Sequence, residues 1–174
     1  MMNSQIEQLA ILNPEIVTEF EVLKYGVREA VRAVVVDEDN RVALLYVAEE
    51  KYYKLPGGGV EPQEDLRSAL NRECLEEIGG EVEIIKEIGT ITEYRKFCKL
   101  KQVSLCYFAR LKGEKGIPHY TQAELAQDFH LLWLPYDEAI LKLSENQATS
   151  IEGREYIIPR DRLFLLAAGE FFYQ

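Results

Sequence analysis

Three glutamates lie close together in one short stretch of this sequence, and their spacing suits chemistry. Glu76 and Glu77 follow Glu73 by three and four positions. If this stretch is helical, all three carboxylates share one face, because an α-helix turns about 100° per residue. Carboxylates this close repel each other unless cations lie between them, and hard divalent cations such as Mg²⁺ or Mn²⁺ prefer oxygen ligands. The spacing therefore predicts a metal site on a helix.

The same stretch carries an apolar pattern that would hold the helix against a sheet. Apolar residues recur every four positions beside the acidic face, at Leu66, Leu70, Cys74 and Ile78. Arg72 flanks the acidic face, where it can orient a carboxylate or contact a phosphate, and Glu64 lies near the expected helix start, where negative charge suits the helix dipole. An isolated acidic helix face is usually only solvated. The residues before the helix are therefore needed to distinguish a metal site from a solvated surface.

The wider spacing joins a glycine loop to the acidic helix. It reads Gly58, five residues, Glu64, seven residues, then Arg72-Glu73-Cys74-Leu75-Glu76-Glu77-Ile78-Gly79. This resembles the Nudix box, Gly-x5-Glu-x7-Arg-Glu-U-x-Glu-Glu-x-Gly-U, in which U is a bulky aliphatic residue. Two positions depart from the box: Cys74 stands at the first U, where it is small but apolar, and Gly80 stands at the last, where it has no side chain to pack.

The resemblance implies roles for the residues that match the box. The metals would be bound by Glu73, Glu76 and Glu77, with the carbonyl of Gly57 as a further ligand. Two other matching residues, Glu64 and Arg72, would brace the loop and the helix. The implied cofactor is Mg²⁺ or Mn²⁺.

The general base is left open by the resemblance. In many Nudix enzymes it is either a glutamate of the box or a glutamate on a distant loop ahead of the final strand. In this chain that loop is 121–128, and it contains Glu124. The residues around Glu124 can equally form one turn of a surface helix with Glu124 exposed, so both alternatives stand.

The strands and helices around these residues are predicted from apolar periodicity. Residues 29–36 and 42–47 flank a turn cluster and predict a hairpin, and 52–55 predicts a short strand that leads into the glycine loop. Residues 82–94 and 102–111 predict an antiparallel pair, and 129–134 a last strand. Helices are expected at 136–143 and from Pro159 through 171, with proline in the first turn.

These elements predict an α/β fold, a Nudix-type α/β/α sandwich around a mixed β-sheet. The chain of 174 residues, 47% of them hydrophobic, suits a single domain at 27–174 behind a lead-in segment at 1–26. Pro14 interrupts the lead-in, for which we expect a short helix or an irregular strand. No stretch approaches the roughly 20 apolar residues of a membrane span, so we expect a cytoplasmic protein without membrane contact.

The net charge of the chain limits the classes of partner that it is expected to bind. A formal net charge of −10 disfavours nucleic acid, whose phosphates would be repelled. A small phosphorylated substrate remains compatible, because divalent metals invert the local field. The three cysteines lack the spacing of a disulfide framework or a zinc site. The aromatic stretch 171–173 could mediate a homodimer or pack on its own chain.

The predicted function is metal-dependent hydrolysis of a nucleoside diphosphate linked to another group, by attack of water on phosphorus, as the Nudix resemblance implies. The alternative is a catalytically silent Nudix-fold module that binds a nucleotide as a sensor; the intact Arg-Glu-x-x-Glu-Glu argues against it. The substrate itself is left open: the family's subgroup markers downstream of the box are not matched, and Lys96 stands where the ADP-ribose subgroup has proline.

Overall fold

One mixed sheet carries the fold in this computed structural model, which describes residues 6–145 and 147–173. The seven described strands have the order β1-β5-β6-β2-β3-β4, and β7 pairs with β3. The strands are β1 (Gln8–Leu12), β2 (Gly26–Val36), β3 (Val42–Val47), β4 (Tyr52–Lys54), β5 (Val82–Arg95), β6 (Leu100–Leu111) and β7 (Phe129–Leu134). The α-helices are α1 (Glu19–Val22), α2 (Leu66–Ile78), α3 (Gln122–Ala126), α4 (Tyr136–Ser144) and α5 (Ile158–Ala167).

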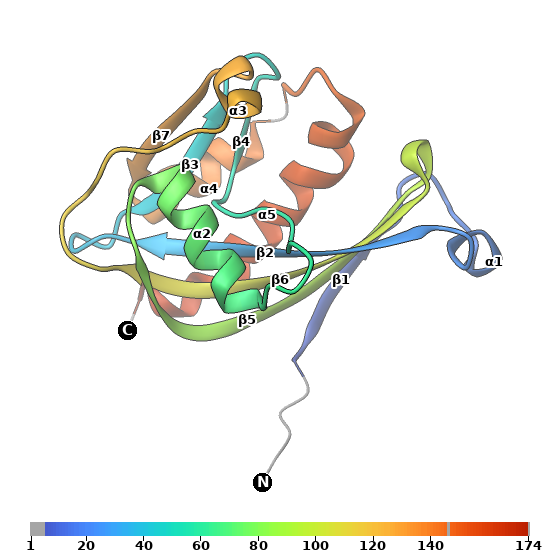
Figure 1. Ribbon diagram of the computed structural model, residues 1–174, viewed down its shortest axis with the longest axis horizontal. Coiled ribbons are helices and arrows are strands. Elements are labelled where there is room, and N and C mark those ends of the chain that lie inside the picture. Colours follow the sequence, from blue (N-terminus) through green and yellow to red (C-terminus); the bar gives the residue numbers. More distant parts are fainter. Residues whose placement is uncertain (1–5, 146, 174) are drawn as a thin grey trace, which may run out of the picture.

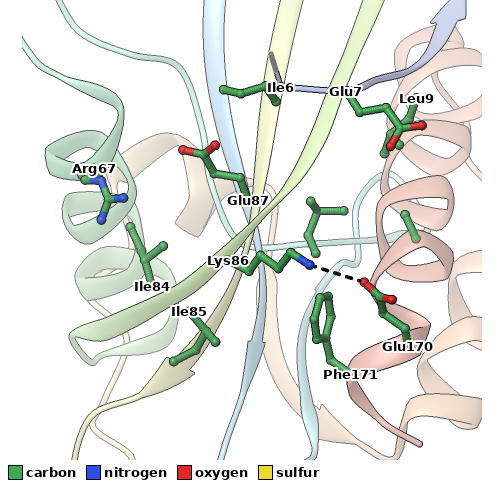
Figure 2. A pocket seen from close by; sticks show the side chains of 12 residues that line it. Ile6, Glu7, Leu9, Arg67, Ile84, Ile85, Lys86, Glu87, Glu170 and Phe171 are labelled. Atoms are coloured by element: carbon green, nitrogen blue, oxygen red, sulfur yellow. Dashed lines mark ion pairs between the residues drawn. The ribbon is translucent and has the colours of Figure 1, made fainter. Parts of the chain in front are cut away.

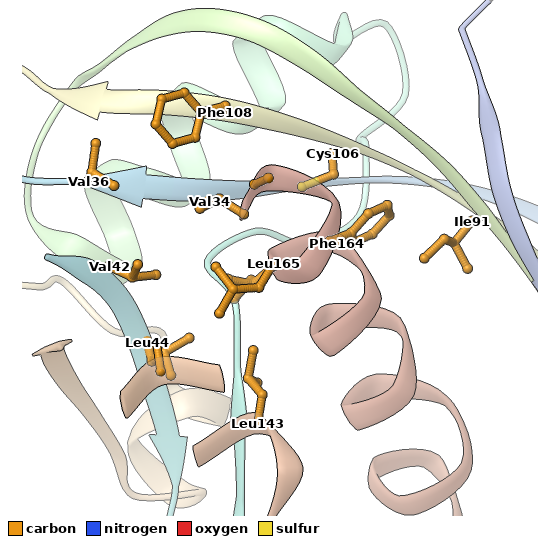
Figure 3. Packing of buried hydrophobic residues seen from close by; sticks show 13 residues of the cluster. Val34, Val36, Val42, Leu44, Ile91, Cys106, Phe108, Leu143, Phe164 and Leu165 are labelled. Carbon is orange, nitrogen blue, oxygen red and sulfur yellow. The ribbon is translucent and has the colours of Figure 1, made fainter. Parts of the chain in front are cut away.

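Helices cover both faces of the sheet, with α2 on one side and α4 and α5 on the other (Figure 1). Strand β2 contributes side chains to the hydrophobic core on each face of the sheet, because successive side chains of a strand point to opposite faces. Val31 and Val35 pack toward α2, whereas Val34 and Val36 pack with Phe164 of α5 (Figure 3). The arrangement confirms the predicted α/β/α sandwich around a mixed sheet.

Helix α2 follows the predicted apolar stripe. Leu70, Cys74 and Ile78 are fully buried, and the Asp65 side chain caps the N-terminus by accepting the Ser68 N–H. The thiol at the first aliphatic box position is therefore part of the core.

The exit of α2 explains the second departure from the box. Gly79 ends the helix in the left-handed conformation. At Gly80, an added Cβ would lie 2.6 Å from the Leu111 Cδ1 of β6. Leu111 thus fills the space that an aliphatic side chain at position 80 would occupy.

The predicted β2–β3 hairpin is paired only next to its turn. Val36 opposes Val42, and no further β2–β3 register pair follows within these two described strands. The backbone N–H groups of β2 that do not pair with β3 bond to the glycine loop instead. Val31 N–H donates to the Gly58 carbonyl at 2.9 Å, and Ala33 N–H donates to the Pro56 carbonyl at 3.0 Å. The loop before α2 is therefore bonded along β2.

Strands β5 and β6 pair antiparallel over their length, as predicted. The lead-in contains both of the elements considered for it: β1 pairs parallel with β5, and α1 forms a single turn behind a Thr18 capping box. Helix α1 lies at the far end of the extended part of β2, beside the β5–β6 turn (Figure 1).

The C-terminal helix α5 begins at Ile158, one residue before the predicted start, and carries Pro159 in its first turn as predicted. A helical run that was not predicted precedes it: this run starts at Ile151 and passes through the π-helical turn η2 (Gly153–Ile157). Ser150 caps the run by accepting the Gly153 N–H. The wide π turn therefore lies directly before the helix that carries Pro159.

The aromatic C-terminus packs on its own chain. The Phe171 ring stacks on Phe108 with centroids 4.8 Å apart, and the Phe172 ring lies 4.5 Å from that of Tyr136. A homodimer stays a prediction. Among the described helices, none combines the length and apolar character that crossing a bilayer requires.

Candidate metal centre

The glycine loop brings backbone groups close to the acidic face of α2. Gly57 has φ of 128°, and a Cβ there would lie 2.2 Å from the Val31 carbonyl oxygen, so only glycine fits between the loop and β2. The Gly57 N–H donates to the Glu77 Oε2 at 2.6 Å. The loop and the helix are thus joined at the predicted ligand Glu77.

Glu77 is a buried carboxylate whose side chain is 1% exposed. Its Oε1 accepts from the Lys54 Nζ at 2.6 Å, and this ammonium also lies 3.4 Å from the Gly57 carbonyl oxygen. Burial raises the pKa of Glu77 to about 7, and the charge of Glu73 adds to the rise while Lys54 opposes it. Burial therefore favours the neutral form of Glu77, and a nearby cation favours the charged form.

Arg72 ties the helix to the loop. Its guanidinium donates to both carboxylate oxygens of Glu64, at 2.9 and 2.8 Å, to Glu73 Oε1 at 2.7 Å, and to the Gly59 carbonyl at 3.1 Å. The bond to Arg72 lowers the pKa of the Glu64 carboxyl. Bidentate pairing of this kind fixes orientation as well as adding energy, so the geometry suits a brace.

Glu124 lies beside the box although it is 47 positions beyond Glu77. One carboxylate oxygen each from Glu73, Glu77 and Glu124 lies within 4.8 Å of the others. The loop ahead of α3 passes over the end of α2, where His119 N–H donates to the Glu76 carbonyl at 2.7 Å. Glu124 belongs to a one-turn helix, capped through Thr121, but it is half-buried instead of exposed and reaches the acidic cluster. Its role as general base stays a prediction.

Glu76 lies at the edge of this cluster. It is half-buried, and its Oε2 is 4.0 Å from the Arg72 Nη1. Burial raises its pKa, and the charges of Glu73 and Glu124 add to the rise. The described group within 4.8 Å contains Glu124 in place of Glu76. Glu76 therefore lies within the field of the cluster without being one of its three closest oxygens.

The donor set fits a hard divalent cation. It consists of carboxylate oxygens and a backbone carbonyl, with no thiolate or imidazole in the described cluster. A cation is already stabilised at this point, because the Lys54 ammonium contacts both Glu77 and the Gly57 carbonyl. Bound Mg²⁺ or Mn²⁺ would replace that ammonium with a stronger positive charge.

Three residues near the centre were missed by the sequence analysis: Lys54, Arg32 and Asp161. Arg32 is buried and donates to the Gly58 carbonyl at 3.0 Å, and Asp161 accepts the Leu55 N–H at 2.8 Å. A signal existed for Arg32, since this arginine interrupts the apolar run from Ala30 to Val36. The contacts of Lys54 with Glu77 and of Asp161 with Leu55 gave no such signal, because each joins residues that are distant in sequence.

A surface pocket lies elsewhere, between β5 and the C-terminal end of the chain (Figure 2). Its charges are mixed: Lys86 Nζ lies 3.8 Å from the Glu170 Oε1, and Arg67 and Glu87 also line it. The clustered carboxylates are not among the residues that line it. The pocket is therefore not a better candidate for the active site than the carboxylate cluster of the box.

The comparison with known families agrees with the box. Residues 26–153 match the NUDIX domain. This chain belongs to the NUDIX family. Its members are hydrolases that act as pyrophosphohydrolases on nucleoside diphosphate derivatives, generally with a divalent metal, and this chain is a pyrophosphohydrolase of that MutT-like kind.

Individual relatives support the same assignment. The chain is 31% identical over 117 residues to YtkD of Bacillus subtilis (strain 168), whose name assigns it provisionally to the 8-oxo-dGTP diphosphatases; the match covers 67% of this chain and 68% of YtkD. Among solved structures, the MutT protein of Methanosarcina mazei Go1 is similar with a TM-score of 0.58 and 18% identity, over 87% of this chain and 99% of that one. A NUDIX hydrolase of Nitrosomonas europaea has a TM-score of 0.60 and 16% identity, over 83% and 90%. These structures show the same fold.

Proposed function

We propose that this NUDIX hydrolase cleaves a small nucleotide-type diphosphate in a reaction that depends on Mg²⁺ or Mn²⁺. The observation that carries the proposal is the convergence of buried Glu73 and Glu77 with Glu124. The Gly57 carbonyl lies nearby, since the Lys54 ammonium contacts both this carbonyl and Glu77. Buried carboxylates at this separation are costly unless cations compensate them. The substrate would be a nucleoside diphosphate linked to a further group, and nucleic acid is disfavoured by the net charge of −10.

The protein's own groups have separable tasks in this proposal. Glu73, Glu76, Glu77 and the Gly57 carbonyl would hold the metal, which when bound neutralises diphosphate oxygens and lowers the pKa of water. Arg72 holds the Glu73 carboxylate and the loop in place. Glu124 would accept the proton of the attacking water, since one of its carboxylate oxygens lies within 4.8 Å of oxygens of Glu73 and Glu77.

A sensor without catalysis is the second candidate. Retention of all the acidic box residues, together with Glu124 at the cluster, disfavours it. The discriminating experiment is a panel of substrates assayed for turnover and, in parallel, for binding, with Mg²⁺ and Mn²⁺. The panel comprises oxidised and normal nucleoside triphosphates, ADP-ribose, dinucleoside polyphosphates and sugar nucleotides.

The first compound to test is 8-oxo-dGTP, because the relative YtkD carries that activity in its name. Turnover of one compound, lost on addition of EDTA and restored by Mg²⁺, is the expected result. Tight binding of a nucleotide without any turnover would favour the sensor.

A further inference from the structure

Asp161 of α5 is bonded to the segment that leads into the glycine loop. The Leu55 N–H donates to the Asp161 Oδ2 at 2.8 Å, across 106 positions of sequence. Both residues are fully buried. Two positions further on, the Gly57 N–H donates to Glu77 at 2.6 Å. The loop is therefore held by one carboxylate from α2 and by a second from α5, on the opposite side of the sheet.

The orientation of Asp161 is itself fixed. Its other oxygen accepts from the Arg160 Nε at 2.7 Å, and the Arg160 Nη1 lies 3.4 Å from the Glu93 Oε1. Glu93 in turn accepts from Gln102 at 2.7 Å and from Arg95 at 3.0 Å. All five side chains are buried. Charge-assisted bonds of this kind in a buried network leave Asp161 little freedom to turn.

Arg32 connects this cluster to the loop at a second point. Its Nη1 donates to the Gly58 carbonyl at 3.0 Å, and the charges that act on it include those of Arg160, Asp161 and Glu77. The Nε of Arg32 and the Nη2 of Arg160 are buried without a hydrogen-bond partner. The cluster is thus costly for the fold, because buried ion pairs rarely stabilise more than apolar packing would.

We infer that Asp161 is a positioning residue for the metal centre. By holding Leu55, it sets the course of the loop so that the Gly57 carbonyl and the Glu77 carboxylate point at the same cation. The Lys54 ammonium marks that shared point, at 3.4 Å from the carbonyl and 2.6 Å from the carboxylate. This inference rests on the proposed function, since it assigns Asp161 a task at the metal site.

The matched pair of variants is Asp161→Asn and Glu93→Gln. Each removes one negative charge from the surroundings of Arg160 at nearly constant size, but only the first weakens the acceptor for the Leu55 N–H. Isothermal titration with Mg²⁺ gives the dissociation constant of each, and thermal melting gives its stability. Asp161→Asn is expected to raise the Mg²⁺ dissociation constant by about tenfold, whereas Glu93→Gln changes it less than about twofold at a similar loss of melting temperature.

A purely structural role predicts something different: both variants would melt earlier and bind Mg²⁺ alike. Equal dissociation constants for wild type and Asp161→Asn would overturn the inference while leaving the proposed function intact. If wild type itself bound neither Mg²⁺ nor Mn²⁺, the proposed function would fail, and the inference with it. Should Asp161→Asn not fold, Arg160→Lys takes its place with the same expectation, because it keeps the charge beside Asp161 but loses the fixed guanidinium geometry.

Discussion

The Lys54 ammonium lies 2.6 Å from the Glu77 Oε1 and within 3.4 Å of the Gly57 carbonyl oxygen. These are two of the oxygens that the account assigns to the metal. The ammonium is therefore the counter-ion of Glu77 in the metal-free protein, and it would compete with Mg²⁺ for the same place. The first two predictions follow from this pair.

Lys54→Met is expected to bind Mg²⁺ more tightly than wild type, by about three- to tenfold, because a competing positive charge near the site is removed. The metal-free variant should melt at a lower temperature, since Glu77 loses its counter-ion. Titration at pH 8.5 keeps protons from competing. Lys54→Arg, which retains the charge, is the control. Weaker Mg²⁺ binding by Lys54→Met would contradict the competition.

The raised pKa of Glu77, about 7, has a definite sign in the pH dependence of stability. Between about pH 4.5 and 7, Glu77 is protonated in the folded state but ionised in the unfolded state, where its pKa is that of an ordinary glutamate. The contribution of Glu77 to the stability of the metal-free protein is therefore largest at low pH and is lost as pH rises through 7. The unfolding free energies of wild type and Glu77→Gln are measured at pH 5 and at pH 8. The value for wild type minus that for Glu77→Gln should be smaller at pH 8 than at pH 5. A difference independent of pH would show that Glu77 titrates normally.

Arg72→Ala should lower both turnover and stability, the latter by about 1–2 kcal/mol, because Glu64, Glu73 and the Gly59 carbonyl all lose a charged donor. Glu73→Gln should mainly lower turnover, since it removes a metal ligand and relieves repulsion among the carboxylates. Urea unfolding and turnover at saturating Mg²⁺ separate the two. An Arg72→Ala protein with wild-type values for both would reduce Arg72 to a solvated charge.

Glu124→Gln is expected to cut turnover by about 10²-fold or more with little change in Mg²⁺ affinity, if Glu124 is the general base. The amide keeps the size of the side chain and can still accept from Thr121, so α3 should persist. The exposed Glu114→Gln serves as the control. Loss of turnover that excess Mg²⁺ restores would make Glu124 a metal ligand, and a normal rate would return the base to the box.

The box and its helix could be predicted from the sequence because their residues are spaced by the geometry of one element. Helical periodicity places Glu73 and Glu77 on one face and Cys74 in the core whatever surrounds them. The same local logic gave the strands of the sheet. The Nudix resemblance pointed to the loop of Glu124 but could not decide whether its side chain reached the cluster.

Contacts between distant segments could not be predicted in this way. Strands β2 and β3 pair only next to their turn because the glycine loop bonds to the backbone groups of β2. No local sequence pattern indicates that the loop will do so. Asp161 was predicted only as a residue near a helix start, and its bond to Leu55 depends on how α5 packs beneath the loop. The helical run before Pro159 was not predicted for a similar reason, since proline at a helix start and proline after a π turn have the same local signature.

The central claim is that hydrolysis occurs at the carboxylate cluster and requires a divalent metal there. The most direct measurement is turnover of the best substrate of the panel by wild type and by Glu77→Gln, each titrated with Mg²⁺ after removal of metal by EDTA. We expect no turnover by metal-free wild type, recovery with Mg²⁺, and at least about 10²-fold less turnover by Glu77→Gln at saturating Mg²⁺. Turnover by wild type without metal, or a Glu77→Gln enzyme as fast as wild type, would contradict it.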